Sequence, residues 1–296
     1  MAAPPGGDQF TLRATGSVAR RQALSRASRY VLLAASLAGV AALVALLWDT
    51  IAAGGSRISW DFITSYPSRR AAQAGLRSSI IGSAWVMATT IILAIPVAVG
   101  TALWIEEFAP RGRFLTIVQL NLANLAGVPS IIYGILGLAV FVRYFGLGPS
   151  ILAGSLTLAL MIIPMTVIAS TEAIRQVPPS IRDGSLALGA THWQTVWHHV
   201  LPGAMPGIMT GTILAISRAA GETAALIMIG AFTFIAYDNT SLSESFTTLP
   251  IQIYNWTIRP QEAFHENAAA AILLLIAAVF SLNLIAVIVR ERFRRY

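Results

Sequence analysis

Long stretches without a charged residue are the feature that most constrains how this chain can fold. A helix needs roughly 20 apolar residues to cross the hydrocarbon core of a bilayer, whereas a strand of an outer-membrane barrel alternates over about ten residues. The uncharged stretches are long enough for helices. They predict an all-α integral membrane protein rather than a barrel, and they cover residues 31–48, 78–105, 114–142, 144–171 and 267–289.

Six transmembrane helices are expected, and the fifth is the least obvious because it contains Arg218 and Glu222. Arginines indicate the orientation, because basic residues are enriched in cytoplasmic loops. With the N-terminus inside, the inner segments hold thirteen arginines and the outer segments six. We therefore expect both termini in the cytoplasm and a multi-pass protein of the cytoplasmic (inner) membrane. The expected spans cover roughly residues 30–48, 79–105, 114–142, 147–171, 207–236 and 267–289.

The regions around the spans define the domain organisation. Residues 1–29 are interpreted as a basic cytoplasmic tail, residues 30–290 as the transmembrane domain, and residues 291–296 as a basic cytoplasmic C-terminus. Residues 172–205 form an inner segment that is not a span. The outer loop 237–266 fits an outer gate, a docking surface or a plain surface loop equally well.

Two absent residue types exclude whole classes of function. All 20 basic residues are Arg, and a chain without Lys has neither a P-loop lysine nor a Schiff-base amine. If ATP drives this protein, another chain hydrolyses it. The chain also has no Cys, which excludes thiol nucleophiles, disulfides and Fe–S clusters.

The remaining polar residues predict no catalytic, metal or cofactor site. All four His lie outside the expected spans, so an intramembrane hydrolase that uses Ser and His lacks a buried base. Glu106 and Glu107 are expected in a solvated inner turn. The net charge of +7 fits basic flanks that face anionic lipid, and no nucleic-acid partner is needed to explain it.

Several helix breakers lie inside the expected spans. Pro96 and Pro164 should each remove a backbone hydrogen bond, and residues 127–130 interrupt the third span near its middle. Such breaks survive in a membrane only where protein or a wet cavity satisfies the backbone. Each break is either an ordinary kink or part of a pathway. The candidate pathway residues at the third break are Gly127, Pro129, Ser130 and Tyr133.

The inner segment 172–205 predicts two short helices joined by a bend. Ser180 can start the first helix, with an acidic residue three positions later as in a capping box. Gly189 is placed to end that helix in the left-handed conformation. Thr191 can cap a second helix that ends before Pro202. This amphipathic elbow either docks into a partner protein or rests on lipid.

The spacing within the elbow resembles the coupling loop of permease subunits of ATP-binding-cassette (ABC) importers. The family pattern is Glu-Ala-Ala, three residues, Gly, nine residues, Ile, any residue and Leu-Pro. The chain keeps the spacing throughout, with His199 in place of Ile as the clearest departure. The resemblance implies that the elbow contacts an ATPase subunit through Asp183, Gly184, Ser185, Gly189, Leu201 and Pro202.

Three further runs resemble the phosphate-specific (Pst) branch of these permeases, and most of all its PstA-type subunits. They cover residues 127–134, 217–223 and 249–256, within a similarity that extends over about residues 75 to 290. The resemblance implies the type I (MetI-like) permease fold. It also implies a complex with a PstC-like permease, two PstB-like ATPase subunits and an external PstS-like binding protein, which together import inorganic phosphate. A permease for sulfate or molybdate, or a passive anion channel, stays open as an alternative.

Arg218 and Glu222 are the candidate pathway residues, because an ionisable residue inside a span is expensive and functional by default. Counted from Gly207, Arg218 lies about 16 Å along the helix, close to the midplane. Glu222 would lie on the same helical face. The two residues either form a structural ion pair, or Arg218 donates two hydrogen bonds to a passing oxyanion. Glu222 would then accept a hydrogen bond from phosphate, which carries a proton, and would repel sulfate.

Overall fold

A computed structural model describes residues 17–231 and 234–293, and every regular element in this part of the chain is a helix. Most of the expected basic tail and the last three residues of the C-terminal segment lie outside the described residues. Short 3-10 turns follow α1 and precede α3, and π-helical turns occur at Trp104–Phe108, Leu138–Tyr144 and Val196–Val200. The α-helices are α1 (Ser17–Gly54), α2 (Trp60–Thr64), α3 (Arg77–Leu103), α4 (Arg113–Ala126), α5 (Ser130–Gly137), α6 (Ile151–Arg175), α7 (Pro179–Ala187), α8 (His192–Thr195), α9 (Leu201–Ala220), α10 (Ala224–Met228), α11 (Leu249–Thr257) and α12 (Glu262–Phe293).

The number of long apolar helices agrees with the expected number of spans. Within the described residues, five helices are long and apolar enough to cross a membrane, and the bent pair formed by α4 and α5 raises the number to as many as six. The helix α1 begins at Ser17, inside the expected tail. The expected extent of the fifth span is wrong, because α9 ends at Ala220 instead of continuing to residue 236.

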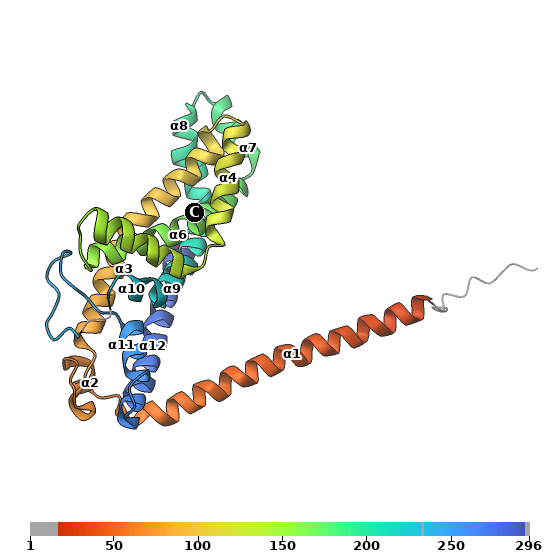
Figure 1. The fold of residues 1–296 in the computed structure, drawn as a ribbon. Coiled ribbons are helices and arrows are strands. Elements are labelled where there is room, and N and C mark those ends of the chain that lie inside the picture. Colours follow the sequence, from red (N-terminus) through yellow and green to blue (C-terminus); the bar gives the residue numbers. More distant parts are fainter. Residues whose placement is uncertain (1–16, 232–233, 294–296) are drawn as a thin grey trace, which may run out of the picture. The chain divides into compact units, whose positions relative to one another are not determined.

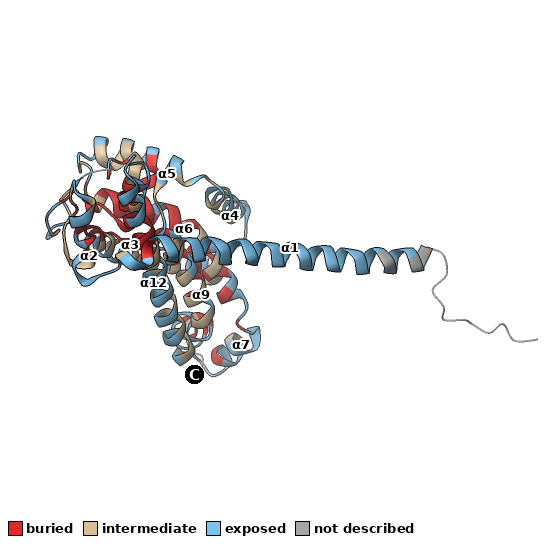
Figure 2. Ribbon diagram, turned by 90° about the horizontal axis from the view of Figure 1, so that it is seen from below, coloured by how far each residue is buried: buried red, intermediate tan, exposed pale blue. Residues whose placement is uncertain are grey.

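The chain divides into two compact units, Met1–Asp49 and Thr50–Tyr296. The described part of the first unit is one helix, whose most apolar window buries none of its residues (Figure 2). A helix that is apolar and exposed on all sides fits a lipid or a partner surface. The second unit contains the remaining helices and the residues considered below.

The helix α6 forms the centre of the second unit. Buried residues make up 67% of its most apolar window, the highest share among the five long spans. It packs along both α3 and α9 (Figure 1). Its core contacts include Leu158 and Ile162, which are fully buried together with Val86 of α3 and Ala215 of α9.

Close contact between α6 and α9 follows from small residues that repeat every four positions at the start of α9. A Cβ atom added to Gly207 would lie 2.6 Å from Ala173 Cβ, and one added to Gly211 would lie 2.5 Å from Ala169 Cβ. Carbon atoms normally pack at about 3.5–4.0 Å, so only Gly permits this separation. The residues that face each other along this contact are Gly203 and Val177, Gly207 and Ala173, and Gly211 and Ala169.

Only one of the three predicted helix breaks interrupts a span. Helices α3 and α6 continue through Pro96 and Pro164 without a break. Residues 127–129 separate α4 from α5, and the two helices meet at an angle of 101°. This break therefore redirects the chain sharply within the membrane-spanning region.

The elbow consists of α7 and α8 with a bend between them, as expected. Gly189 has a φ angle of 86°, in the left-handed region, and Thr191 and Gln194 form a capping box at the start of α8. The predicted cap at Ser180 is wrong, because α7 begins at Pro179 after Pro178 and no side chain caps it. Proline at the first turn replaces that cap with a fixed φ angle.

The predicted end of the second elbow helix before Pro202 is also wrong. The helix continues from α8 through the π turn Val196–Val200 into α9. A proline ring normally clashes with the carbonyl four residues earlier. We attribute the continuation to the wider π turn, in which Leu201 N–H donates to Val196 O.

Candidate functional site

Arg218 lies in the last turn of α9 and is exposed. Its Nη1 atom is 3.9 Å from the sulfur of Met165, near the middle of α6. The C-terminal end of a helix carries partial negative charge, which stabilises a cation there. Within the described residues, no carboxylate forms an ion pair with Arg218. Apart from Nη1, which donates to the Met165 sulfur, the guanidinium donors are therefore not held by a carboxylate in this part of the chain.

Glu222 does not lie on the same helical face as Arg218, and this expectation is corrected. The helix ends at Ala220, Gly221 follows it, and Glu222 leads into α10. Its Oε1 atom accepts a hydrogen bond from the backbone N–H of Ala225 at 3.1 Å. The interpretation of Arg218 and Glu222 as a structural ion pair is wrong. The Glu222 carboxylate instead accepts from an N–H at the start of α10, which has no partner within that helix.

Tyr133 links the broken span to the same region. Its hydroxyl donates to the carbonyl oxygen of Leu125 near the end of α4 at 2.8 Å, and the same oxygen accepts from the Val128 N–H at 3.0 Å. Tyr133 also belongs to the buried cluster that contains Ala219 of α9. Next to Tyr133, Gly134 packs directly on α10, where an added Cβ would lie 2.8 Å from Ala225 Cα. The break at 127–129 therefore brings α5, α10 and the end of α9 together.

The residues at the break have different surroundings. Gly127 follows the last turn of α4 and is exposed, and Pro129 precedes α5 and is also exposed. Ser130 begins α5 and is half-buried, and Tyr133 is buried. Of these candidate pathway residues, Tyr133 is the one that shares a buried cluster with Ala219, the residue after Arg218.

The predicted coupling residues gather on the elbow and at the start of α9. Asp183, Gly184 and Pro202 are exposed and so accessible to a partner. Ser185 is buried, and its hydroxyl lies 2.9 Å from that of Thr195, a hydrogen bond that joins α7 to α8 across the bend.

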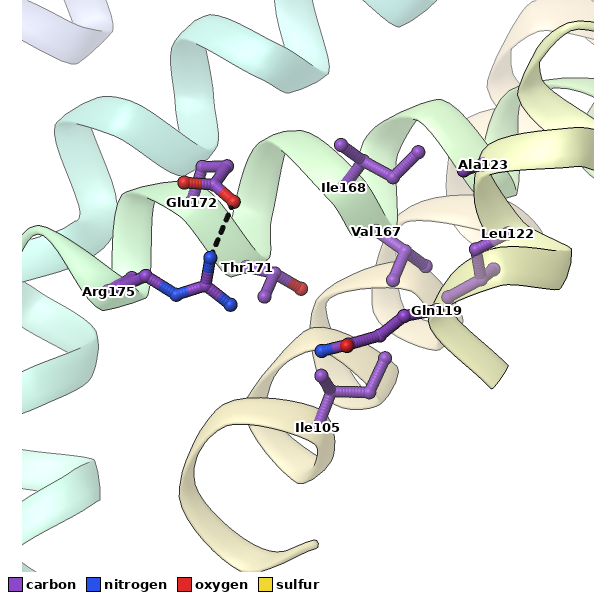
Figure 3. A pocket seen from close by; sticks show the side chains of 9 residues that line it. All are labelled: Ile105, Gln119, Leu122, Ala123, Val167, Ile168, Thr171, Glu172 and Arg175. Atoms are coloured by element: carbon purple, nitrogen blue, oxygen red, sulfur yellow. Dashed lines mark hydrogen bonds and ion pairs between the residues drawn. The ribbon is translucent and has the colours of Figure 1, made fainter. Parts of the chain in front are cut away.

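A pocket of about 250 Å³ lies on the elbow side of α6, between α4 and the π turn at the end of α3. Figure 3 shows Arg175 bound to Glu172 at its rim. Arg175 also binds Glu106, so two carboxylates already neutralise it, and the pocket is a weaker anion site than Arg218. Its lining consists of Ile105, Gln119, Leu122, Ala123, Val167, Ile168, Thr171, Glu172 and Arg175.

Comparison with known proteins decides the family. The model of the family described as "Binding-protein-dependent transport system inner membrane component" matches residues 98–295. The chain belongs to this family. It is a multi-pass permease of the inner membrane and a component of an ABC importer that depends on a binding protein, and a separate subunit hydrolyses ATP.

Individual relatives agree with this assignment over most of the permease. This chain is 32% identical over 265 residues to "Probable ABC transporter permease protein YqgI" of Bacillus subtilis, and the match covers 85% of this chain and 90% of the relative. It is 30% identical over 253 residues to "Phosphate transport system permease protein PstA 1" of Mycobacterium tuberculosis, covering 84% and 82%.

A solved structure confirms the predicted MetI-like fold. The permease resembles a chain of the MetNI methionine ABC transporter with a TM-score of 0.58 at 17% identity. The match covers 72% of this permease and 94% of that chain.

The sequence does not predict the surroundings of Glu107. Glu107, expected in a solvated turn, has a side chain that is only 4% exposed and pairs with Arg182 of the elbow. These residues are 75 positions apart in the chain, so no local pattern connects them. The one available signal was a pair of acidic residues directly after an apolar span.

Proposed function

We propose that this permease conducts inorganic phosphate into the cytoplasm and that Arg218 contacts the anion on its way. The observation that carries the proposal is the exposed guanidinium at the end of α9, beside the middle of α6 and without a carboxylate partner among the described residues. The relatives named for phosphate transport support the choice of substrate.

The proposed chemistry is reversible hydrogen bonding without bond cleavage. Arg218 remains charged at any physiological pH and can donate two parallel hydrogen bonds to an oxyanion. Each hydrogen bond to a charged group contributes about 1.5–3 kcal/mol, which is strong enough to admit the ion and weak enough to release it. Tyr133 shares a buried cluster with Ala219, the residue after Arg218. The break at Gly127, Pro129 and Ser130 would keep this part of the path free of a continuous helix.

The proposed role of Glu222 follows from its position at α10. Its Oε1 atom holds the start of α10, and its carboxylate can also accept a hydrogen bond from phosphate, which carries a proton near neutral pH. Sulfate has no such proton and would meet an unpaired negative charge. Glu222→Gln should therefore lower the preference for phosphate over sulfate.

The proposed assembly contains a PstC-like permease, two PstB-like ATPase subunits and an external PstS-like phosphate-binding protein. The exposed residues Asp183, Gly184 and Pro202 would contact the ATPase at the cytoplasmic face. Gly189 would set the bend of the elbow, Ser185 would hold its two helices together, and Leu201 would connect it to α9. Closure of the ATPase pair on ATP would then move the elbow.

Uptake of labelled phosphate by cells that lack this gene tests the proposal. Wild type, Arg218→Gln and Arg143→Gln are supplied at equal membrane abundance; Arg143 is exposed at the end of another helical segment. We expect wild type and Arg143→Gln to restore phosphate uptake, and Arg218→Gln to restore at least about tenfold less, since the loss of one charged hydrogen bond corresponds to roughly that factor. Restored sulfate or molybdate uptake in place of phosphate, or uptake without ATP, contradicts the proposal.

A further inference from the structure

The π turn Trp104–Phe108, which ends α3, holds two carboxylates in different surroundings. The Glu107 side chain is 4% exposed, whereas that of Glu106 is 22% exposed. A buried carboxylate is costly unless it is paired and hydrogen-bonded. Glu106 pairs with Arg175 of α6, and Glu107 finds its partners on the elbow.

Arg182 of α7 is the main partner of Glu107. Its Nε and Nη2 atoms donate to Glu107 Oε1 at 3.0 and 2.7 Å. The same guanidinium donates to the carbonyl oxygens of Val177 and Ile174, just after and within the last turn of α6, at 2.6 and 3.0 Å. One planar group thus joins α7, α3 and α6. A Lys ammonium, with a single point of charge, does not reproduce this fork.

A second contact to the same turn comes from α8. His192 Nε2 lies 2.9 Å from the carbonyl oxygen of Glu107. The Phe108 ring lies against the rings of His192 and Trp193, with centroids 5.1 and 5.9 Å apart. Both elbow helices therefore hold residues 107 and 108.

The helix α3 connects this turn to the opposite end of the second unit. It packs along α6, and at its other end Arg77 binds Asp238 through both carboxylate oxygens. Because packed helices transmit displacement rather than absorb it, a movement of the elbow reaches the segment around Asp238 through α3.

We propose that Glu107 is a positioning residue for transport: held by Arg182, it is the anchor through which the elbow moves α3. The elbow can then shift without sliding past the transmembrane helices. This inference rests on the proposed coupling role of the elbow and is independent of which anion the importer carries. An anchor of this kind affects the number of anions moved per ATP hydrolysed more than it affects ATP hydrolysis itself.

The experiment uses the complete importer in proteoliposomes, with anion transport and ATP hydrolysis measured on the same preparation. The main variant is Glu107→Gln, which keeps the size of the side chain and removes its charge. The matched control is Glu106→Gln, one residue away in the same turn. Arg182→Lys keeps the charge and loses the fork, and the exchanged pair Glu107→Arg with Arg182→Glu tests for rescue.

We expect the Glu107→Gln importer to assemble and hydrolyse ATP, while the number of anions transported per ATP hydrolysed falls about tenfold. A factor of this size is typical for coupling between two sites. Arg182→Lys should give an intermediate loss, the exchanged pair should recover part of it, and Glu106→Gln should stay within about twofold. Unchanged transport per ATP in both Glu107→Gln and Arg182→Lys overturns the proposal, as does an equal loss of transport and hydrolysis. If the wild type carries another anion instead of phosphate, the substrate assignment fails and the ratio is measured with that anion.

Discussion

Replacing Gly211 by Ala should destabilise the permease by forcing its two central helices apart. The added methyl group would lie 2.5 Å from Ala169 Cβ on α6, about 1 Å short of normal carbon contact. Neither helix can yield locally, because Gly207 makes an equally close contact with Ala173 one turn away. The strain therefore has to move α9 as a whole.

The size of the effect follows from two opposing terms. Overpacking of a well-packed core costs about 1–3 kcal/mol, and Ala is favoured over Gly in a helix by about 0.5–1 kcal/mol. The free energy of unfolding should therefore fall by up to about 2.5 kcal/mol. Gly100 of α3 is the matched control, because it is helical and an added Cβ would have no neighbour within 4 Å. Gly100→Ala should raise the stability by about 0.5–1 kcal/mol.

The assay is reversible unfolding of the purified chain in detergent, followed by circular dichroism during denaturant titration. The double variant Gly211→Ala with Ala169→Gly removes the opposing methyl group and should recover most of the lost stability. If Gly211→Ala and Gly100→Ala shift the unfolding midpoint equally, or if the double variant is less stable than Gly211→Ala, the close packing of α6 and α9 is not the cause.

Three further predictions concern the ends of the helices. Arg77 holds the pKa of Asp238 below its usual value. This pair therefore contributes stability at neutral pH that is lost as the pH falls below about 4. Thermal unfolding between pH 3 and 6 should show this dependence, and Arg77→Gln should weaken it. Thr191→Ala removes the capping box and should lower the stability of the elbow by about 1 kcal/mol. Limited proteolysis should then cut the elbow faster, and an unchanged rate of cleavage contradicts the role of the cap. Tyr133→Phe removes the hydroxyl bond to the Leu125 carbonyl, which keeps its bond from the Val128 N–H, and should lower the free energy of unfolding by about 0.5–1.5 kcal/mol. A stability equal to wild type would contradict this contribution of the hydroxyl.

Features that depend on local sequence were predicted well. The helical class and the number of spans follow from uncharged length, the bend at Gly189 follows from the conformational freedom of Gly, and the cap at the start of α8 follows from Thr191. The four-residue repeat of Gly203, Gly207 and Gly211 is a local pattern that favours close helix contact. It did not identify α6 as the partner, because small residues mark a packed face without naming what packs on it.

The errors arose where tertiary contacts or backbone geometry override a local pattern. The expected pairing of Arg218 and Glu222 assumed a continuous helix, although Gly221 between them is a typical helix end. Pro202 was expected to stop a helix that a π turn lets continue. The partnership of Glu107 and Arg182 depends on the fold that brings α3 and α7 together. A single sequence does not show that the Glu107 side chain is buried.

The central claim is that this permease carries phosphate past Arg218, and transport by the purified importer tests it most directly. Proteoliposomes would hold ATP on the side of the elbow and receive labelled phosphate with the binding protein on the other side. The account predicts ATP-dependent phosphate uptake that exceeds sulfate uptake and falls at least about tenfold in Arg218→Gln. Phosphate uptake by Arg218→Gln at the wild-type rate, or no phosphate uptake by the wild type, would contradict it.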